Sequence, residues 1–268
     1  MTIPFWKAHG AGNDFLYTFP DGSDLAEETL PRLAAAICHR NTGVGADGWY
    51  LVGVPGPDGA DAKIRLFNSD GSAAELSGNG TRGAAAVLLE AGMVRGPRVI
   101  IATGAGAVEL EVTVRRGPEY HIAMRLPPPV VLDAHATIEG SSAAILDVGN
   151  PQCAVPVDSL DFDWRAPGAA LEGHPRFPAR TNVSFFRRRD DRTIEARFYE
   201  RGAGPTLSSG TGSVGAAVAA IVRRLVESPV TVITEGGRLT VGWGGSGEPA
   251  MLTGPAAVTV RGVWFAAL

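Results

Sequence analysis

One short motif occurs twice in this sequence, and it constrains the fold more than any other feature. Residues 77–80 (SGNG) have a partner in residues 209–212 (SGTG), 132 positions later (209 − 77 = 132). Each copy follows a strand-like run, 64–68 or 196–200, and leads into an alanine-rich run of the kind that forms helices. A strand, a glycine-rich turn and a helix start, repeated once per half, predict two similar domains that face one site.

Length and composition indicate an ordinary globular chain with no nucleic-acid or membrane partner. The 268 residues suffice for about two domains, and 19% charged with 45% hydrophobic residues is a typical balance. A net charge of −4 offers no basic surface to nucleic acid or anionic lipid. The N-terminus lacks a signal-peptide pattern, and no apolar run approaches the ~18 residues of a membrane span. We therefore expect a cytoplasmic enzyme.

Two cysteines and one arginine run are interpreted as structural. Cys38 and Cys153 lie in unrelated contexts and have neither disulfide nor metal-site spacing, so no metal is predicted. We interpret Cys38 as a packing thiol at a helix end and Cys153 as a buried strand residue rather than a catalytic thiol. Residues 187–189 (RRR) are followed by two aspartates, which favours a solvated hairpin turn over a binding patch.

Hydrophobic periodicity predicts an α/β (α+β) fold in which each domain has a mixed β-sheet wrapped around a central helix. The predicted helices span 27–38, 83–91 and 215–224. The predicted strands span 3–7, 15–19, 49–54, 63–67, 98–102, 107–115, 120–126, 181–187, 193–199, 230–234, 238–243 and 257–265. We place an N-terminal domain at 1–117 and a C-terminal domain at 118–258. The last strand, about 259–268, is expected to cross back to the first domain.

Glycine-rich turns at helix starts have a chemistry of their own. They expose backbone N–H groups that no helical carbonyl accepts, beside the positive end of the helix dipole. Such places bind carboxylates or phosphates, so two of them could hold one small anion. Ser77 and Ser209 would then face that ligand from opposite sides. The alternative is that both serines are N-caps with a purely structural role, which serine suits well.

Further short motifs are spread along the chain. They are residues 9–15 (HGAGNDF), 43–48 (GVGADG), 67–72 (FNSDGS), 77–82 (SGNGTR), 149–151 (GNP), 199–204 (YERGAG), 210–212 (GTG) and 253–255 (TGP). In this order, and over essentially the full length, the set resembles the diaminopimelate epimerase family. Jointly the motifs are highly specific.

The resemblance implies a cofactor-independent epimerase that interconverts LL- and meso-diaminopimelate, in lysine and cell-wall biosynthesis. It implies two pseudo-symmetric α/β domains that close over a small diamino dicarboxylic acid, and a homodimer. No pyridoxal phosphate is implied, and no lysine of this chain lies in a context that suggests that cofactor.

The family's two catalytic cysteines, one per domain, correspond here to Ser77 and Ser209. In the family, one cysteine removes the α-proton as thiolate while the other, as thiol, protonates the opposite face. A free hydroxyl resembles water, whose pKa is about 15.7, so serine acts only when a neighbouring base activates it. Glu200 is the matching central residue that can be that base. The histidine that commonly follows Gly-Asn-Pro in the family is Gln152 here, which cannot exchange a proton.

The residues that recognise the substrate in the family all match in this chain. By resemblance, the α-carboxylate is held by backbone N–H groups of Gly78, Asn79, Gly210 and Thr211. The distal carboxylate is recognised by Asn68, Asn150, Asn182 and Arg201, of which the arginine suits a bidentate grip. The amino groups are taken by Asn13 and Glu200. A turn or cap is the commoner role of a single asparagine, and His9 we interpret as a structural hydrogen-bonding residue of its loop.

Three functions fit these observations. The first is a diaminopimelate epimerase in which serines replace the two cysteines, as in a variant made to trap substrate. The second is a natural relative that performs other isomerase or dehydratase chemistry through Glu200 or an activated serine. The third is a non-catalytic protein that binds diaminopimelate or a similar amino acid. Retained binding without α-proton exchange would favour the first or third function over the second.

Overall fold

The structure is a computed structural model that describes residues 1–20, 25–74 and 76–266. The chain forms two compact units. Unit 1 contains Met1–Met124 and the stretch from Gly254 on, and unit 2 contains Arg125–Thr253. The boundary lies within strand β8 (Glu119–Leu126), whereas the sequence placed it ahead of that strand. Of the segment 259–268, the last two residues lie outside the described residues.

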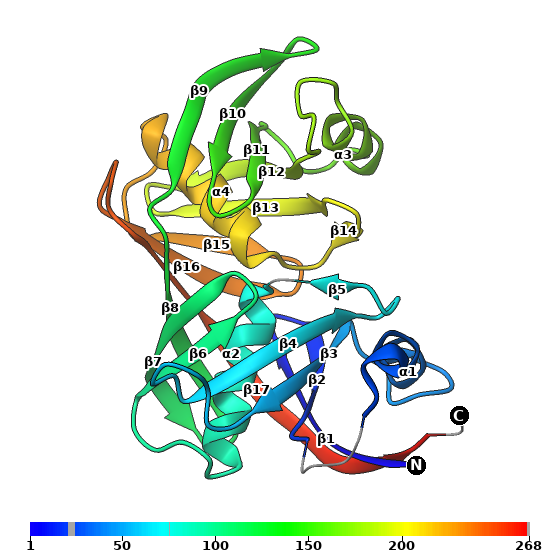
Figure 1. Ribbon diagram of the computed structural model, residues 1–268. Helices are drawn as coiled ribbons and strands as arrows, with labels where there is room; N and C mark the ends of the chain where they lie inside the picture. Colours follow the sequence, from blue (N-terminus) through cyan, green and yellow to red (C-terminus); the bar gives the residue numbers. More distant parts are fainter. Residues whose placement is uncertain (21–24, 75, 267–268) are drawn as a thin grey trace. The chain divides into compact units, whose positions relative to one another are not determined.

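Unit 1 is a mixed sheet with helices (Figure 1). Its strands are β1 (Thr2–Gly10), β2 (Asn13–Thr18), β3 (Gly48–Gly53), β4 (Ala62–Asn68), β5 (Ala73–Ala74), β6 (Arg98–Thr103), β7 (Gly106–Arg116), most of β8 and the later part of β17 (Ala250–Phe265). Its helices are the 3-10 turn η1 (Glu27–Thr29), α1 (Leu30–Cys38) and α2 (Gly78–Glu90). Strands β1 and β2 meet in a turn in which Ala11 and Gly12 both have positive φ, as in a type I′ hairpin.

Unit 2 has the same kinds of element. Its strands are β9 (Val130–Ile138), β10 (Ser141–Asp147), β11 (Pro151–Pro156), β12 (Asn182–Asp190), β13 (Thr193–Glu200), β14 (Gly204–Thr206), β15 (Val230–Thr234), β16 (Gly237–Trp243) and the first part of β17. Its helices are α3 (Arg165–Glu172) and α4 (Gly210–Val222).

The two units share one order of strand pairing. In unit 1, β1–β2 is antiparallel, β2–β3 parallel, β3–β4 antiparallel, β4–β6 parallel, and β6–β7–β8 antiparallel. In unit 2, β10–β11 is antiparallel, β11–β12 parallel, β12–β13 antiparallel, β13–β15 parallel, and β15–β16–β17 antiparallel. The predicted mixed sheets of similar topology are therefore confirmed, and the repeat seen in the sequence reflects a repeat of the fold.

The helix at the centre of each unit is buried along most of its length. In α2 every residue from Gly78 to Leu88 is buried, and α4 is buried from Val214 to Ala220. The predicted helices began at residues 83 and 215, which was wrong by about one turn in each case. Both helices start earlier because Ser77 and Ser209 act as N-caps directly ahead of the glycines.

Two glycines of α2 allow buried tyrosines to lie against the helix. A Cβ added to Gly83 would lie 2.1 Å from the hydroxyl oxygen of Tyr17, and one added to Gly80 would lie 2.3 Å from that of Tyr50. The Tyr17 hydroxyl donates to the carbonyl oxygen of Gly80 at 2.8 Å, which fixes its position. The close approach of β2 and β3 to the helix thus requires glycine at both positions.

Gly83→Ala is expected to lower the free energy of unfolding by about 1–3 kcal/mol, the usual cost of overpacking a well-packed core. Urea denaturation measures this. The matched control is Gly215→Ala in α4, where the new Cβ would meet the Gln152 side chain at 3.1 Å. Both variants gain the same helix propensity, so the clash alone separates them. Equal stability of the two variants would contradict the steric argument.

Four strands and one helix of unit 2 were not predicted, namely β9, β10, β11, β14 and α3. Strand β9 alternates exposed and half-buried residues only loosely, with Leu132 65% exposed. Helix α3 contains Pro167 and Gly168, which lower helix propensity. These elements are held by pairing and packing with neighbours rather than by their own periodicity.

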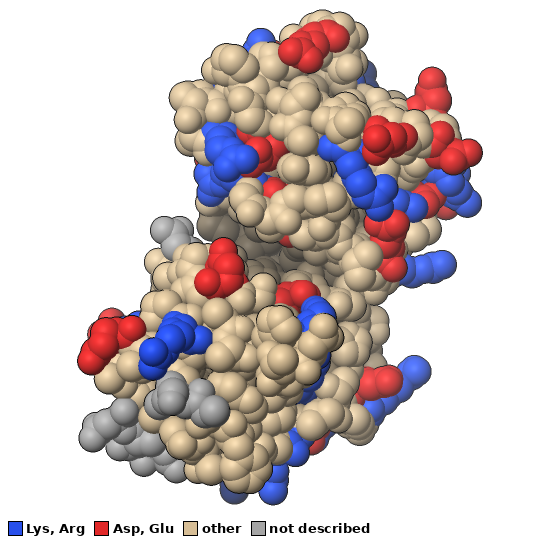
Figure 2. All heavy atoms as spheres, turned by 90° about the vertical axis from the view of Figure 1, so that its right-hand side faces the viewer, with Lys and Arg blue, Asp and Glu red and all other residues tan. Residues whose placement is uncertain are grey.

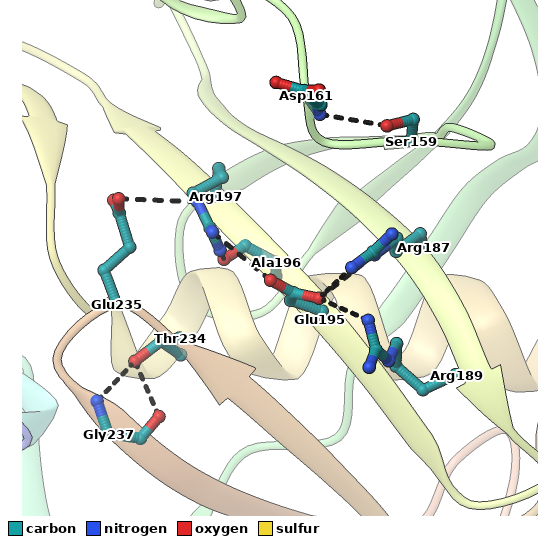
Figure 3. A network of polar contacts seen from close by, with 10 residues as sticks. All are labelled: Ser159, Asp161, Arg187, Arg189, Glu195, Ala196, Arg197, Thr234, Glu235 and Gly237. Carbon is teal, nitrogen blue, oxygen red and sulfur yellow. Dashed lines mark hydrogen bonds and ion pairs between the residues drawn. The ribbon is translucent and has the colours of Figure 1, made fainter.

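The arginine run 187–189 lies at the end of β12, not in a turn as expected. Arg187 and Arg189 both reach Glu195 on the neighbouring strand β13, at 2.8 Å and 3.2 Å, and Arg197 reaches the other carboxylate oxygen at 3.2 Å (Figure 3). Arg197 also lies 3.5 Å from Glu235. The run is therefore engaged by carboxylates of its own unit.

Charged side chains of both signs are interspersed on the face drawn in Figure 2. This distribution agrees with the small net charge of −4 and provides no single-sign field on that face. Among the described residues, no helix is both long and apolar enough to cross a membrane.

Candidate active site

The two repeated serines have almost the same local geometry. Ser77 has φ −125° and ψ 122°, and its Oγ accepts from the backbone N–H of Gly80 at 3.2 Å. Ser209 has φ −128° and ψ 127°, and its Oγ accepts from the N–H of Gly212 at 3.0 Å. Each serine is therefore an N-cap, and it also stands at the positive end of a buried helix. The predicted strand–turn–helix unit is confirmed in both halves.

In unit 2, Ser209 is joined to the predicted base. The Ser209 hydroxyl donates to Oε1 of Glu200 at 2.5 Å, while the same oxygen accepts from Gly212. Ser209 is only 2% exposed, so little water competes for this hydrogen bond. The serine proton thus points at a carboxylate, which is the arrangement that activates a hydroxyl.

Asn150 and Asn182 each lie in hydrogen bonds with other residues of the predicted site. Asn150 accepts from Gln152 at 2.6 Å and donates to the Thr211 hydroxyl at 3.3 Å. Asn182 accepts from the backbone N–H of Arg201 at 3.0 Å. The fold of unit 2 therefore brings four predicted residues together near Glu200 and Ser209. They are Asn150 just before β11, Asn182 at the start of β12, Arg201 just after β13 and Thr211 in α4.

In unit 1, Asn13 and Asn79 belong to one hydrogen-bonded chain. Asn79 donates to Oδ1 of Asn13 at 3.3 Å, and Asn13 donates to Oδ2 of Asp47 at 2.6 Å. At the other end, Arg82 donates to Oδ1 of Asn79. The predicted residues Asn13 and Asn79 thus lie together, although 66 positions separate them in sequence.

Asn68 stands apart from this chain of side chains. Its Nδ2 donates to the hydroxyl of Ser72 at 2.9 Å, and its backbone N–H donates to the carbonyl oxygen of Ser72 at 2.8 Å. The next residue, Ser69, donates to the backbone carbonyl of Asp47 at 3.1 Å. Asn68 therefore shapes its own turn, as single asparagines commonly do.

Sequence reasoning missed two tyrosines that pack against helix α2, which Ser77 caps. Tyr17 and Tyr50 are buried and their rings stack, with centroids 5.2 Å apart and an angle of 3°. Burial raises the pKa of Tyr50, an effect that the neighbouring Thr81 and Ser77 partly offset. Both tyrosines lie in strands whose apolar sequence indicates a buried core. Nothing in the sequence indicated that they would lie close to helix α2.

The two cysteines are packing residues, as predicted. Cys38 is 2% exposed and Cys153 fully buried, each within an apolar cluster. Burial raises the pKa of both thiols to about 12, far above the range in which a thiolate forms at neutral pH. The interpretation of His9 was wrong: it lies in β1, and its Nδ1 has no hydrogen-bond partner among the described residues.

Among the described residues, no three histidine, cysteine or acidic side chains gather in a group that could hold a metal ion.

Comparison with known proteins identifies the family. The model described as "Diaminopimelate epimerase" matches residues 5–128 and 144–259. The diaminopimelate epimerase of Ralstonia nicotianae is 38% identical over 281 residues, which cover 98% of this chain and 96% of the relative. That of Ectopseudomonas mendocina is 38% identical over 282 residues, with coverage of 98% and 99%.

Solved structures show the same fold at lower identity. A phenazine biosynthesis protein of the PhzF family from Bacillus anthracis has a TM-score of 0.77 at 19% identity, covering 99% of this chain and 100% of that one. A hydroxyproline epimerase from Agrobacterium vitis has a TM-score of 0.72 at 19% identity, covering 98% and 92%. Because the family model matches both units and close relatives align over nearly the full length, the chain belongs to the diaminopimelate epimerase family.

Proposed function

We propose that this chain interconverts LL- and meso-diaminopimelate by moving the proton of one α-carbon. Membership of the family supports this substrate, and so do the recognition residues that the resemblance of the sequence motifs implies. We further propose, from the resemblance, that it acts without a cofactor, in the cytoplasm and as a homodimer, in lysine and cell-wall precursor synthesis.

The α-carboxylate is bound, in this proposal, by backbone N–H groups at helix N-termini. The first N–H groups of α2 belong to Gly78 and Asn79, and those of α4 belong to Gly210 and Thr211. No helical carbonyl reaches these groups, and the helix dipole favours an anion beside them. The same positive ends stabilise the negative charge that spreads into the carboxylate when the α-proton leaves.

Further predicted site residues hold, in this proposal, the remaining groups of the substrate. Arg201, on the unit 2 side, offers a guanidinium to the distal carboxylate, with amides from Asn68, Asn150 and Asn182. An ammonium group requires acceptors, which Asn13 Oδ1 and the Glu200 carboxylate provide.

One hydrogen bond carries the catalytic part of the proposal, namely that from Ser209 Oγ to Glu200 Oε1 at 2.5 Å. As Oγ takes the α-proton from carbon, its own proton passes to Glu200, and the electron pair of the C–H bond moves into the carboxylate. No free alkoxide forms on Ser209. Glu200 thereby supplies the basicity that a hydroxyl alone lacks.

On the other face of the α-carbon, Ser77 supplies the proton. Its neighbour Tyr50 stays protonated at neutral pH, because burial raises the pKa of the phenol. The phenol donates a hydrogen bond to the oxygen that is left when Ser77 gives its proton to carbon, and solvent water then returns a proton to that oxygen.

The experiment follows the α-proton by ¹H NMR in deuterated water, with LL- and meso-diaminopimelate in separate samples. Loss of the α-proton signal from both isomers, with convergence on one mixture, is expected. Ser77→Ala/Ser209→Ala is the control and should be silent. Exchange that survives in this control would refute the serine mechanism. Binding by calorimetry without any exchange would instead favour a non-catalytic binding protein.

A further inference from the structure

Arg82 is a buried cation with no carboxylate partner among the described residues. It is 0% exposed, and its Nη2 donates to Oδ1 of Asn79. Its Nε and Nη1 have no partner within the described parts of the chain. Burial lowers the pKa of Arg82 to about 10, so the guanidinium is still charged at neutral pH. A buried charge without an ionic partner is expensive, and an apolar side chain of similar size would fill the space at less cost.

The arginine begins a chain of hydrogen bonds whose direction is fixed at both ends. A guanidinium only donates, so the atom of Asn79 that faces Arg82 must be the amide oxygen. Asn79 Nδ2 then donates to Asn13 Oδ1 at 3.3 Å, and Asn13 Nδ2 donates to Asp47 Oδ2 at 2.6 Å. The carboxylate of Asp47 only accepts. Neither amide can rotate by 180° without placing two donors or two acceptors face to face.

Asp47 is itself held in place. Its Oδ1 accepts from Arg40 at 2.7 Å, and its Oδ2 accepts from the backbone N–H of Asp14 at 3.0 Å as well as from Asn13. With Nδ2 of Asn13 committed to Asp47, the amide has its oxygen on the side of Asn79. That oxygen carries a second lone pair, which can accept from an ammonium group.

We propose that Arg82 and Asp47 are positioning residues that fix the amide orientation of Asn79 and Asn13, so that Asn13 presents an oxygen to the substrate's ammonium group. The inference rests on the proposed function, because it concerns the ammonium group of the same substrate. Neither residue touches the substrate. Reversal of the Asn13 amide would turn its N–H groups toward a cation and lose an acceptor.

The two ends of the chain carry opposite charges, and this distinguishes positioning from simple electrostatics. Arg82→Met removes a positive charge and Asp47→Ala removes a negative one. A charge effect alone would change the affinity for diaminopimelate in opposite directions in the two variants. Loss of amide orientation weakens binding in both.

The test measures the Kd of LL-diaminopimelate by calorimetry for the intact chain, Arg82→Met, Arg82→Lys, Asp47→Ala and the double variant Arg82→Met/Asp47→Ala. Both single variants are expected to bind about 10-fold or more weakly, as for loss of one charge-assisted hydrogen bond. Arg82→Lys, which also only donates, should remain within about 3-fold of the intact chain. The double variant should be no weaker than the worse single variant by more than about 3-fold, because both act through one chain of contacts.

Opposite effects of the two charge removals, additive effects, or failure of lysine to rescue would overturn the inference. Circular dichroism checks that each variant is folded. If Arg82→Met does not fold, Asp47→Ala alone tests the inference. The Asp47 side chain is 39% exposed, so its removal opens no cavity in the core. No binding by the intact chain would refute the proposed function and this inference with it. Normal binding by the intact chain with unchanged Kd in Asp47→Ala refutes the inference alone.

Discussion

The double variant Ser77→Cys/Ser209→Cys is expected to exchange the α-proton of diaminopimelate about 10²–10⁴-fold faster than the chain with serine, the range over which a well-matched acid–base pair contributes. A thiol has a pKa of about 8.5, and the N-terminus of a helix lowers it further toward neutrality. Both serines occupy such N-terminal positions, with Oγ already bonded to a backbone N–H at 3.2 Å and 3.0 Å. Deuterium incorporation followed by NMR gives the rate constants.

Ser208→Cys provides the matched control for the double variant. Ser208 is buried and precedes the cap of α4, and its hydroxyl has no partner among the described residues. A thiol placed there lies outside the cap and should leave the exchange rate near that of the unaltered chain. Equal acceleration by this control, or none by the double variant, would show that the two cap positions are not the sites of proton transfer.

Glu200→Gln is expected to slow α-proton exchange by at least about 100-fold. Glutamine keeps the size of the side chain and still accepts a hydrogen bond from Ser209, but its amide cannot take up the serine proton. The loss is expected in kcat rather than in the stability of the fold. Initial rates of deuterium incorporation at saturating diaminopimelate measure it.

Glu195→Gln is the matched control for Glu200→Gln, because both glutamates lie in strand β13. Glu195 accepts from three arginines of unit 2 (Figure 3). Its variant should retain the exchange rate, whatever it does to stability. If Glu200→Gln retained the rate as well, Glu200 would serve only to orient Ser209, and another base would have to be found.

The sequence predicted the repeated motif and the features that depend on residues close together in the chain. The two copies of the serine–glycine motif become two capped helices, since a cap depends on residues within one turn. The pairing of Ser209 with Glu200 spans nine positions and was within reach of a motif argument. The helix starts were placed too late, because glycine lowers helix propensity and hid the first turn.

Contacts between distant parts of the chain could not be predicted. Arg82 lies inside a motif that the sequence analysis singled out, yet its role depends on Asn13 in β2 and on Asp47 just before β3. Propensity does not report which side chains meet across 66 positions. The same holds for Tyr17 and Tyr50. Their strands are apolar, which indicates a core but not that the two tyrosines pack against α2.

Strand β17 has a consequence for how the protein folds during its synthesis on the ribosome. Its residue Phe265 pairs with Thr2, so strand β17 lies beside β1, although unit 2 separates them in the sequence. Unit 2 occupies one uninterrupted stretch, Arg125–Thr253, whereas unit 1 is completed by residues from Gly254 on. The pairing of β1 with β17 forms only after both strands have been synthesised. The sheet of unit 1 is therefore completed after unit 2 has been translated, although most of unit 1 precedes unit 2 in the sequence.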